Sequence, residues 1–409
     1  MKRFVFSLRF FGYQVGNYSL FDELEEEFQM KRIRLYFTVF MTICLCSACG
    51  KPQEATEDPS HQVTGSEAGK QAGEASESAE TTSVQIPETY ERTEENVYFK
   101  ADIICLDEVR KGSVKIPQVR LQQIDEDKVI DETFGNAVIT KDEILENPGD
   151  DGKVHRARYL WGTAEQHVSL YDYGASYIST LYPYIAHSFD LEGKEGNYST
   201  EAQLSFMSTD SAWSEIKGIF DRMQVSLGED PSFKHYALDY QTMASQEYVM
   251  DMDGNIDRSQ YKPEWTVEDE GYYFCIWQTY NGIKIHTPYS DMIKKYADFN
   301  APVQVMLSAN GLEYLSLGRT FLIDPKESIE ELVSLDTVAD VVIKKYSMIL
   351  TDAIYTIDRM ELCYYPVQDR EGNYELKCVW IISFTEEPTL TATGRFQMMV
   401  DAVSGEELL

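Results

Sequence analysis

The chain has 409 residues, of which 43% are hydrophobic and 12% aromatic, so it has enough apolar side chains for one large or two medium cores. This composition excludes disorder of the whole chain, and 7 Cys in 409 residues exclude a disulfide scaffold. With 69 acidic against 36 basic residues the net charge is −33, which repels phosphate backbones, so we expect no nucleic-acid partner.

Residues 30–50, MKRIRLYFTVFMTICLCSACG, have the order of a signal sequence: basic residues, a short apolar run, then small residues before Cys49. The apolar run is too short to span a bilayer comfortably. The segment resembles the lipobox of bacterial lipoproteins, although Cys46 stands where that motif usually has Leu. The resemblance implies cleavage before Cys49 and a lipid on its thiol. The alternative is a short buried helix that ends in an ordinary cysteine.

We therefore expect residues 30–48 to be a lipoprotein signal peptide, with Cys49 holding the protein to the extracellular face of the cell membrane. Residues 1–29 end in an acidic stretch that is unusual before a signal, so we expect translation to start at Met30. Residues 49–95 are rich in Glu, Ser, Thr, Ala and Gly, a composition that predicts a disordered acidic tether.

Residues 96–263 are predicted to form a first lobe. It begins with strand patterns at residues 97–109 and 114–124, followed by a short helix at residues 128–134. The helix predicted over Thr209–Met223 has apolar residues at helical spacing and Asp210 or Ser211 as its cap: Trp213, Ile216, Ile219, Phe220 and Met223.

Residues 264–409 are predicted to form a second lobe, and two Asn-Gly turns give its clearest signals. Asn281-Gly282 and Asn310-Gly311 each stand between strand-like runs, as in two-residue β-hairpins. In the first hairpin Tyr280 is expected to face Ile283. One strand face is then apolar, and the other carries Tyr273, Cys275, Trp277, Lys284 and His286, which we expect to lie under a helix rather than in a ligand site.

A capping-box pattern at residues 328–331 predicts a helix that restarts near Asp336. Two strands follow, joined by a polar loop, and a symmetric loop places Cys363 close to opposite Cys378. Outside the membrane a disulfide between these cysteines is a candidate, with two free buried thiols as the alternative.

The order of hairpins, helix and further strands predicts an α+β fold: antiparallel sheets with helices packed on one face, in two lobes. The ending FQMMVDAVSGEEL resembles the closing strand and turn of PepSY-type modules, in which Asp401 and Gly405 match. The order of elements resembles the extracytoplasmic YycH and YycI regulators of Gram-positive bacteria, and the whole mature chain resembles uncharacterised lipoproteins of clostridia and their relatives. This resemblance implies binding and regulation rather than catalysis, with no functional residue carried over.

Other motifs favour structural interpretations. Residues 251–257 have the rhythm of a calcium loop, but Ile256 and Lys262 stand where its Gly and Glu belong, so a polar turn is preferred. Cys275 is interpreted as a buried small hydrophobe rather than a nucleophile. The Tyr-rich residues 159–184 are interpreted as half-buried strand tyrosines rather than a sugar or peptide platform. We expect no catalytic residue, no metal site and no cofactor.

We therefore predict a membrane-anchored extracytoplasmic lipoprotein that serves as a non-catalytic interaction or sensing module for an envelope or membrane partner. One alternative is an envelope hydrolase that uses carboxylates, since many acidic pairs exist and no local signature marks such a site. The other alternative is a solute-binding lipoprotein, whose length this chain matches.

Overall fold

The computed structural model describes residues 85–148, 154–162, 166–189, 194–251, 254–286, 301–348, 353–369, 371–387 and 395–408. The chain divides into Met1–Thr82 and Ser83–Leu409, and the structure described below is that of the second unit. Residues 1–29, the signal at residues 30–48 and Cys49 lie outside the described residues, so their roles stay predictions. No helix in the described residues is long and apolar enough to cross a membrane.

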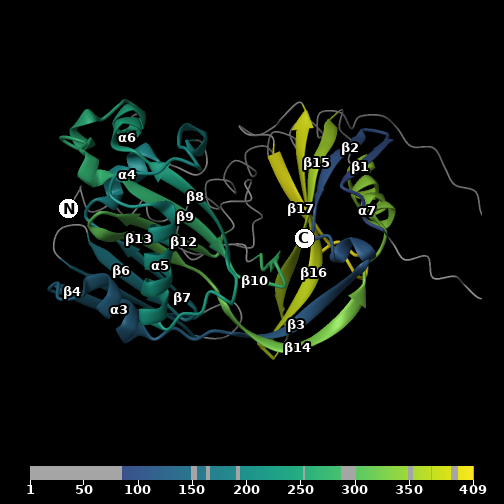
Figure 1. Ribbon diagram of the computed structural model, residues 1–409, viewed down its shortest axis with the longest axis horizontal. Coiled ribbons are helices and arrows are strands. Elements are labelled where there is room, and N and C mark those ends of the chain that lie inside the picture. Colours follow the sequence, from purple (N-terminus) through teal and green to yellow (C-terminus); the bar gives the residue numbers. More distant parts are fainter. Residues whose placement is uncertain are drawn as a thin grey trace, which may run out of the picture. The chain divides into compact units, whose positions relative to one another are not determined.

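Two β-sheets make up the frame of the second unit (Figure 1). The seven-stranded sheet has the order β1-β2-β15-β16-β3-β14, with β17 also paired to β16. All its pairs are antiparallel except β2–β15, which is parallel. Its strands are β1 (Thr89–Glu94), β2 (Val97–Ile104), β3 (Ser113–Leu121), β14 (Phe321–Glu331), β15 (Ile354–Gln368), β16 (Tyr374–Glu387) and β17 (Arg395–Asp401).

The eight-stranded sheet is antiparallel throughout, in the order β4-β5-β6-β7-β13-β12-β9-β8. Its strands are β4 (Lys141–Pro148), β5 (Val154–Trp161), β6 (His167–Tyr171), β7 (Gly174–Ile178), β8 (Ser232–Leu238), β9 (Gly271–Trp277), β12 (Val303–Ser308) and β13 (Gly311–Leu317). A two-stranded hairpin, β10 (Thr279–Tyr280) and β11 (Ile283–Lys284), continues from β9.

Five α-helices accompany the sheets in the described residues: α3 (Glu126–Phe134), α4 (Tyr182–Ser188), α5 (Thr209–Met223), α6 (Tyr240–Gln246) and α7 (Leu335–Ser347). Short 3-10 turns lie at Val109–Lys111, Glu195–Asn197, Arg258–Gln260 and Val267–Asp269. Antiparallel sheets with separate helices confirm the predicted α+β class.

The eight-stranded sheet is an insertion between two paired strands of the other sheet. The chain leaves along β3 and returns along β14, and these two strands pair side by side (Figure 1). The predicted boundary near Pro263 therefore does not separate the sheets, because β1–β3 precede it and pair with strands that follow it. Such long-range pairing leaves no local periodicity from which the boundary can be read.

Each sheet has its own apolar core. On the eight-stranded sheet, α3 and α5 cover one face, where Ile216 and Phe220 pack against strand residues such as Phe274. On the opposite face Tyr182 of α4 stacks on Tyr314, with ring centroids 4.0 Å apart. On the seven-stranded sheet α7 buries Val338 and Val342 among the side chains of β2, β15 and β16. A helix thus covers the surroundings of Tyr273, as the sequence predicted. For Lys284 and His286 the same prediction is wrong, because the hairpin leaves this sheet and both residues lie against β15.

The strongest local patterns are confirmed. Helix α5 has the predicted bounds, although its cap is Ser208, whose hydroxyl accepts from the Ser211 N–H at 3.2 Å. Both Asn-Gly hairpins form, with Tyr280 facing Ile283. The predicted capping box at residues 328–331 is wrong, because these residues complete β14, and α7 is capped instead by Ser334.

The predicted tether, residues 49–95, runs too far into the folded part. Ile86 is buried in the core of the seven-stranded sheet, and β1 covers Thr89–Glu94. The sequence did not predict β1 because its residues are polar, and an edge strand with both faces near solvent lacks apolar alternation. The remaining tether residues, 49–84, lie outside the described residues.

Candidate functional site

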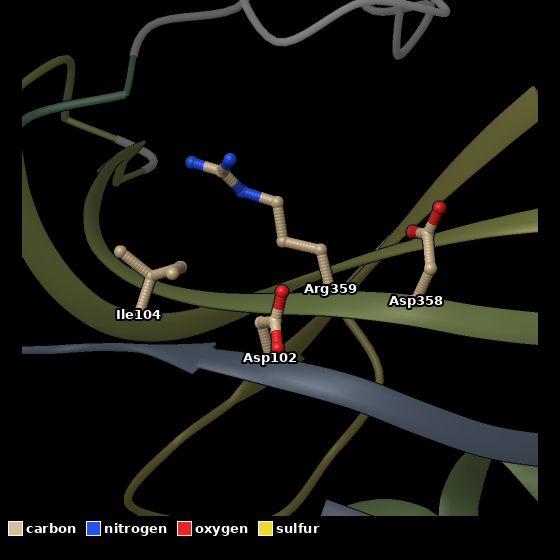
Figure 2. Close-up of a pocket in the computed structure, with 4 residues that line it drawn as sticks. All are labelled: Asp102, Ile104, Asp358 and Arg359. Atoms are coloured by element: carbon tan, nitrogen blue, oxygen red, sulfur yellow. The ribbon is translucent and has the colours of Figure 1, made fainter. Parts of the chain in front are cut away.

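A pocket of about 280 Å³ opens where β2 pairs in parallel with β15. Four side chains line it: Asp102, Ile104, Asp358 and Arg359. Figure 2 shows Asp102 and Ile104 rising from β2 and Asp358 and Arg359 from β15 on the same side of the strand pair. This face is opposite the one that α7 covers, because Phe99 and Met360 of these strands point into the α7 core.

A β-bulge explains why two consecutive residues of β15 line the same pocket. The pairing of β15 with β16 passes from Ile357 to Arg359 and leaves Asp358 without an opposite residue. Ile357 and Met360 both point into the core, so Asp358 and Arg359 both lie on the outer face. The bulge thus brings a carboxylate and a guanidinium to the mouth of the pocket.

Next to the pocket, Glu361 lies between two cations. Its Oε1 is 3.1 Å from Lys284 Nζ and its Oε2 is 2.7 Å from Arg359 Nη2. Glu361 is only 9% exposed, and although burial alone raises the pKa of its carboxyl, the two cations hold that pKa below its usual value. Arg359 also lines the pocket, so its ion pair with the buried Glu361 holds one side chain of the pocket wall in place.

Lys284 reaches this place because the β10–β11 hairpin leaves the eight-stranded sheet and joins the other sheet. The N–H of His286 donates to the Tyr364 carbonyl at 2.7 Å, and Ile285 forms a parallel bridge to Tyr364. Strand β11 therefore follows β2 along the same side of β15. The ammonium of Lys284 also lies 4.8 Å from the Trp277 ring centroid, so the cluster contacts residues of both sheets.

The titratable groups behind the pocket are held in neutral forms. Burial lowers the pKa of His286 to about 4, against a rise from Glu361 and a further lowering from Lys284. Burial also raises the pKa of Cys363, and Glu361 adds to the rise. A neutral imidazole and a protonated thiol are suited to packing, whereas a nucleophilic cysteine needs a depressed pKa.

These side chains favour recognition by charge over covalent chemistry. Two carboxylates, a guanidinium and the apolar Ile104 can bind a group that carries both charge and hydrocarbon. Among the described residues, no three His, Cys, Asp or Glu side chains come together as they would around a metal ion.

The structure has the two predicted disulfide partners as free thiols. Cys363 faces Val379, and Cys378 faces Tyr364, so the cysteines are offset by one residue. Both are buried, which is the alternative that the sequence left open.

The pocket itself was not predicted from the sequence, although Lys284 and His286 were noted as one face of a hairpin. Asp102 and Asp358 are far apart in the chain, and neither a parallel pairing nor a bulge leaves a signal in either strand.

The remaining motifs are turn and strand residues. Asp251 accepts a hydrogen bond from the Asn255 N–H at 2.8 Å, and Gly254 has φ +83°, the geometry of a tight turn. Tyr159 and Tyr171 are half-buried strand residues, as expected. For the rest of the span the prediction is wrong in part, because Tyr177 is buried and Tyr182 and Tyr184 belong to α4. Cys275 is buried in the middle of β9.

Comparison with solved structures gives one likeness of fold. A crystal structure of a protein from Eubacterium rectale ATCC 33656, described as uncharacterized, aligns with a TM-score of 0.54 at 14% identity, over 79% of this chain and 94% of that chain. The C-terminal domain of YpeB from Bacillus megaterium aligns over 70% of this chain and 96% of its own at 10% identity, with a TM-score of only 0.24. No protein-family model and no curated protein matches the chain. The first likeness shows a shared fold alone.

Proposed function

We propose that the chain is an extracytoplasmic protein anchored by a lipid on Cys49, and that it binds an envelope or membrane partner without catalysing a reaction. The pocket between β2 and β15 is then part of the binding surface. The observation that carries the binding role is the mixed charge of this pocket, in which Asp102, Asp358 and Arg359 share one opening. Such a set suits ion pairing with a partner.

Among the described residues, the protonation states of the buried thiols of β15 and β16 and of His286 support a non-catalytic role. Burial raises the pKa of Cys363 and of Cys378, and it lowers the pKa of His286 to about 4. A thiol and an imidazole in these forms cannot work as a nucleophile and base pair near neutral pH.

The PepSY-like and YycI-like assignment of the last residues belongs to the same proposal. A helix, α7, followed by β15, β16 and β17 gives the order that the resemblance implied. The closing turn has the expected roles: the Asp401 carboxylate accepts from the N–H groups of Val403 and Ser404, both at 2.9 Å, and Gly405 has φ +74°. Modules of this type are implied to bind and regulate.

The anchor is tested by cell fractionation. Cys49→Ser should move the protein from the membrane fraction to the medium, while the matched variant Cys46→Ser should leave it in the membrane. Retention of the Cys49→Ser protein in the membrane would show that a lipid on Cys49 is not its sole anchor.

One observation favours a second candidate, a carboxylate-dependent envelope hydrolase, because Asp102 and Asp358 line the same pocket. Activity on purified cell wall that is abolished by Asp102→Asn or Asp358→Asn would replace the binding proposal. Equal behaviour of wild type and both variants in this assay would leave binding as the role.

A ligand-induced rise in melting temperature that Arg359→Gln removes would instead favour a solute-binding role.

A further inference from the structure

Strand β4 is one of the two end strands of the eight-stranded sheet. β4 pairs with β5 along all of its 8 residues, and no described strand pairs with its other side. The outer edge of such a strand presents main-chain N–H and C=O groups that can pair with another extended segment. Natural proteins protect such edges with bulges, prolines, inward charges or charged side chains, of which β4 has only the charged side chains and a terminal proline.

The middle of β4 is apolar and exposed. Ile144 is 52% exposed and Leu145 is 44% exposed, and because side chains alternate along a strand they lie on opposite faces. β14, one of the two end strands of the other sheet, has a bulge between Asp324 and Glu327 that contains Pro325. β4 pairs with β5 without a bulge, and its only proline is its last residue, Pro148.

The side chains along β4 are acidic at both ends of the apolar pair. Asp142 and Glu143 precede it and Glu146 follows it, against the single cation of Lys141. Asp142 is held by Arg158 at 2.8 Å, which fixes the strand to β5 without covering its outer edge. The charge of this edge therefore favours a basic partner.

One face beside the edge is aromatic. Tyr159 and Trp161 of β5 stack with centroids 6.0 Å apart, and Tyr171 of β6 meets Tyr159 edge-on at 6.4 Å. Lys141 Nζ lies 4.2 Å from the Trp161 ring centroid, so this surface already holds one cation against an aromatic ring. A strand added at β4 would place alternate side chains beside Leu145 on this face.

From this edge we infer that β4 binds an extended peptide segment of alternating basic and apolar residues, which adds to the sheet as a further antiparallel strand. Main-chain hydrogen bonds to β4 hold the segment. On one face its apolar side chains lie beside Leu145 and the rings of Tyr159 and Trp161. On the other face its basic side chains meet Asp142 and Glu146, because these two residues lie opposite Leu145 in the strand alternation. This site is separate from the β2–β15 pocket and does not depend on the lipid anchor.

The test uses the full chain and a fluorescent peptide of alternating Lys and Val, as long as β4. The control probe is the same peptide with N-methyl groups on every second amide, on the edge that would pair with β4. These methyl groups remove the main-chain N–H donors that strand pairing needs. Binding is read by fluorescence anisotropy, and amide exchange of residues 141–148 is read by mass spectrometry. The variant Glu146→Lys reverses a charge on the face that meets the basic side chains and leaves the Asp142–Arg158 pair in place. Glu330→Lys on β14 is the matched control, and unchanged unfolding transitions show that both proteins fold.

The unmethylated peptide should bind and slow exchange in residues 141–148. The β4 variant should weaken this binding about tenfold or more, and the β14 control should not. Equal binding of the methylated peptide would overturn the inference, because the contact would not be a strand pairing. So would the absence of binding, or an equal loss in both variants. A monomer–dimer change caused by the β4 variant alone, without peptide binding, would assign the edge to a second copy of this chain and would also overturn it.

Discussion

Cys363 on β15 and Cys378 on β16 miss each other by one register position. Cys363 lies opposite Val379, and Cys378 lies opposite Tyr364. Because side chains alternate along a strand, Cys378 points into the core under α7, whereas Cys363 packs with a smaller cluster on the other face. The sheet therefore keeps two thiols apart that the sequence places almost together.

We predict that Cys363 and Cys378 are reduced and react slowly in the native protein, because both are buried and burial raises the pKa of each thiol. Thiol labelling followed by mass spectrometry measures this. The half-buried Cys105 should label faster, and denaturation without a reductant should make both buried thiols reactive. A cross-linked peptide pair containing Cys363 and Cys378 in an unreduced digest would contradict the structure.

Gln278→Ala should lower the free energy of unfolding by about 3 kcal/mol, because it leaves buried main-chain groups without partners. The Gln278 side chain accepts from the Phe321 N–H at 2.7 Å and donates to the Phe321 carbonyl at 2.8 Å, which ties β14 to the segment after β9. Urea unfolding measures the change. Gln241→Ala, on the exposed side of α6, should stay within about 0.5 kcal/mol of wild type, and equal effects of the two variants would refute this role of Gln278.

Glu361→Gln should destabilise the fold by about 3 kcal/mol, since it leaves Lys284 and Arg359 beside each other without the carboxylate that they share. The comparison variant is Glu407→Gln, which breaks a solvent-exposed pair with Lys345 and should cost less than about 1 kcal/mol. Both are measured by chemical denaturation. A smaller loss for Glu361→Gln than for Glu407→Gln would show that the cluster beside the pocket is not what stabilises this part of β15.

The stability of the fold should fall as the pH drops from about 6.5 to about 4. Burial lowers the pKa of His286 to about 4, so over this range the unfolded state binds a proton that the native imidazole does not. Its stabilising contribution is complete above the unfolded pKa and is lost as protons bind below it. Denaturant titrations at several pH values should give a slope that approaches about 1.4 kcal/mol per pH unit for this group.

His286→Asn should reduce that slope between pH 6.5 and 4. His187, whose pKa burial and the nearby Lys194 also lower to about 4, should keep a slope of its own in this variant. Carboxylates with depressed pKa, such as Glu361, lose their contribution only at lower pH. An unchanged slope in the His286→Asn protein would contradict this assignment.

Gly405→Ala should cost about 1–2 kcal/mol because Gly405 has φ +74° and an added Cβ would lie 3.0 Å from Thr337 Cγ2. The loss would loosen the turn that closes β17 against α7. Gly196→Ala is the control, since no atom lies within 4 Å of its added Cβ. Thermal unfolding of both variants tests this, and equal melting temperatures would show that the turn does not need glycine.

Local signals in the sequence predicted the parts of the fold that local physics decides. The apolar spacing of Ile216 and Phe220 gives α5, and Asn281-Gly282 fixes the β10–β11 register, because both depend on residues close together in the chain. The capping-box pattern at Ser328 failed because the same residues pair with β3, and a ladder of main-chain hydrogen bonds overrides a weak capping preference.

Long-range pairing explains what the sequence did not show. The pocket needs β2 beside β15, and the bulge at Asp358 that aims two consecutive side chains outward. The residues of β2 do not indicate that this strand pairs with β15, and the residues of β15 do not indicate its partner either. The register of Cys363 also depends on the lengths of both strands and of their loop, so a symmetric loop was a reasonable assumption but missed by one residue.

In-cell photo-cross-linking of the full chain tests most directly whether it binds an envelope or membrane partner at the β2–β15 pocket. A photoreactive residue replaces Ile104 at the pocket, and a second protein carries it at the exposed Met348, beyond α7. We predict that position 104 captures one envelope or membrane protein, that position 348 does not, and that Cys49→Ser abolishes the capture. Recovery of no specific protein, or of the same proteins from both positions, would contradict the proposed function.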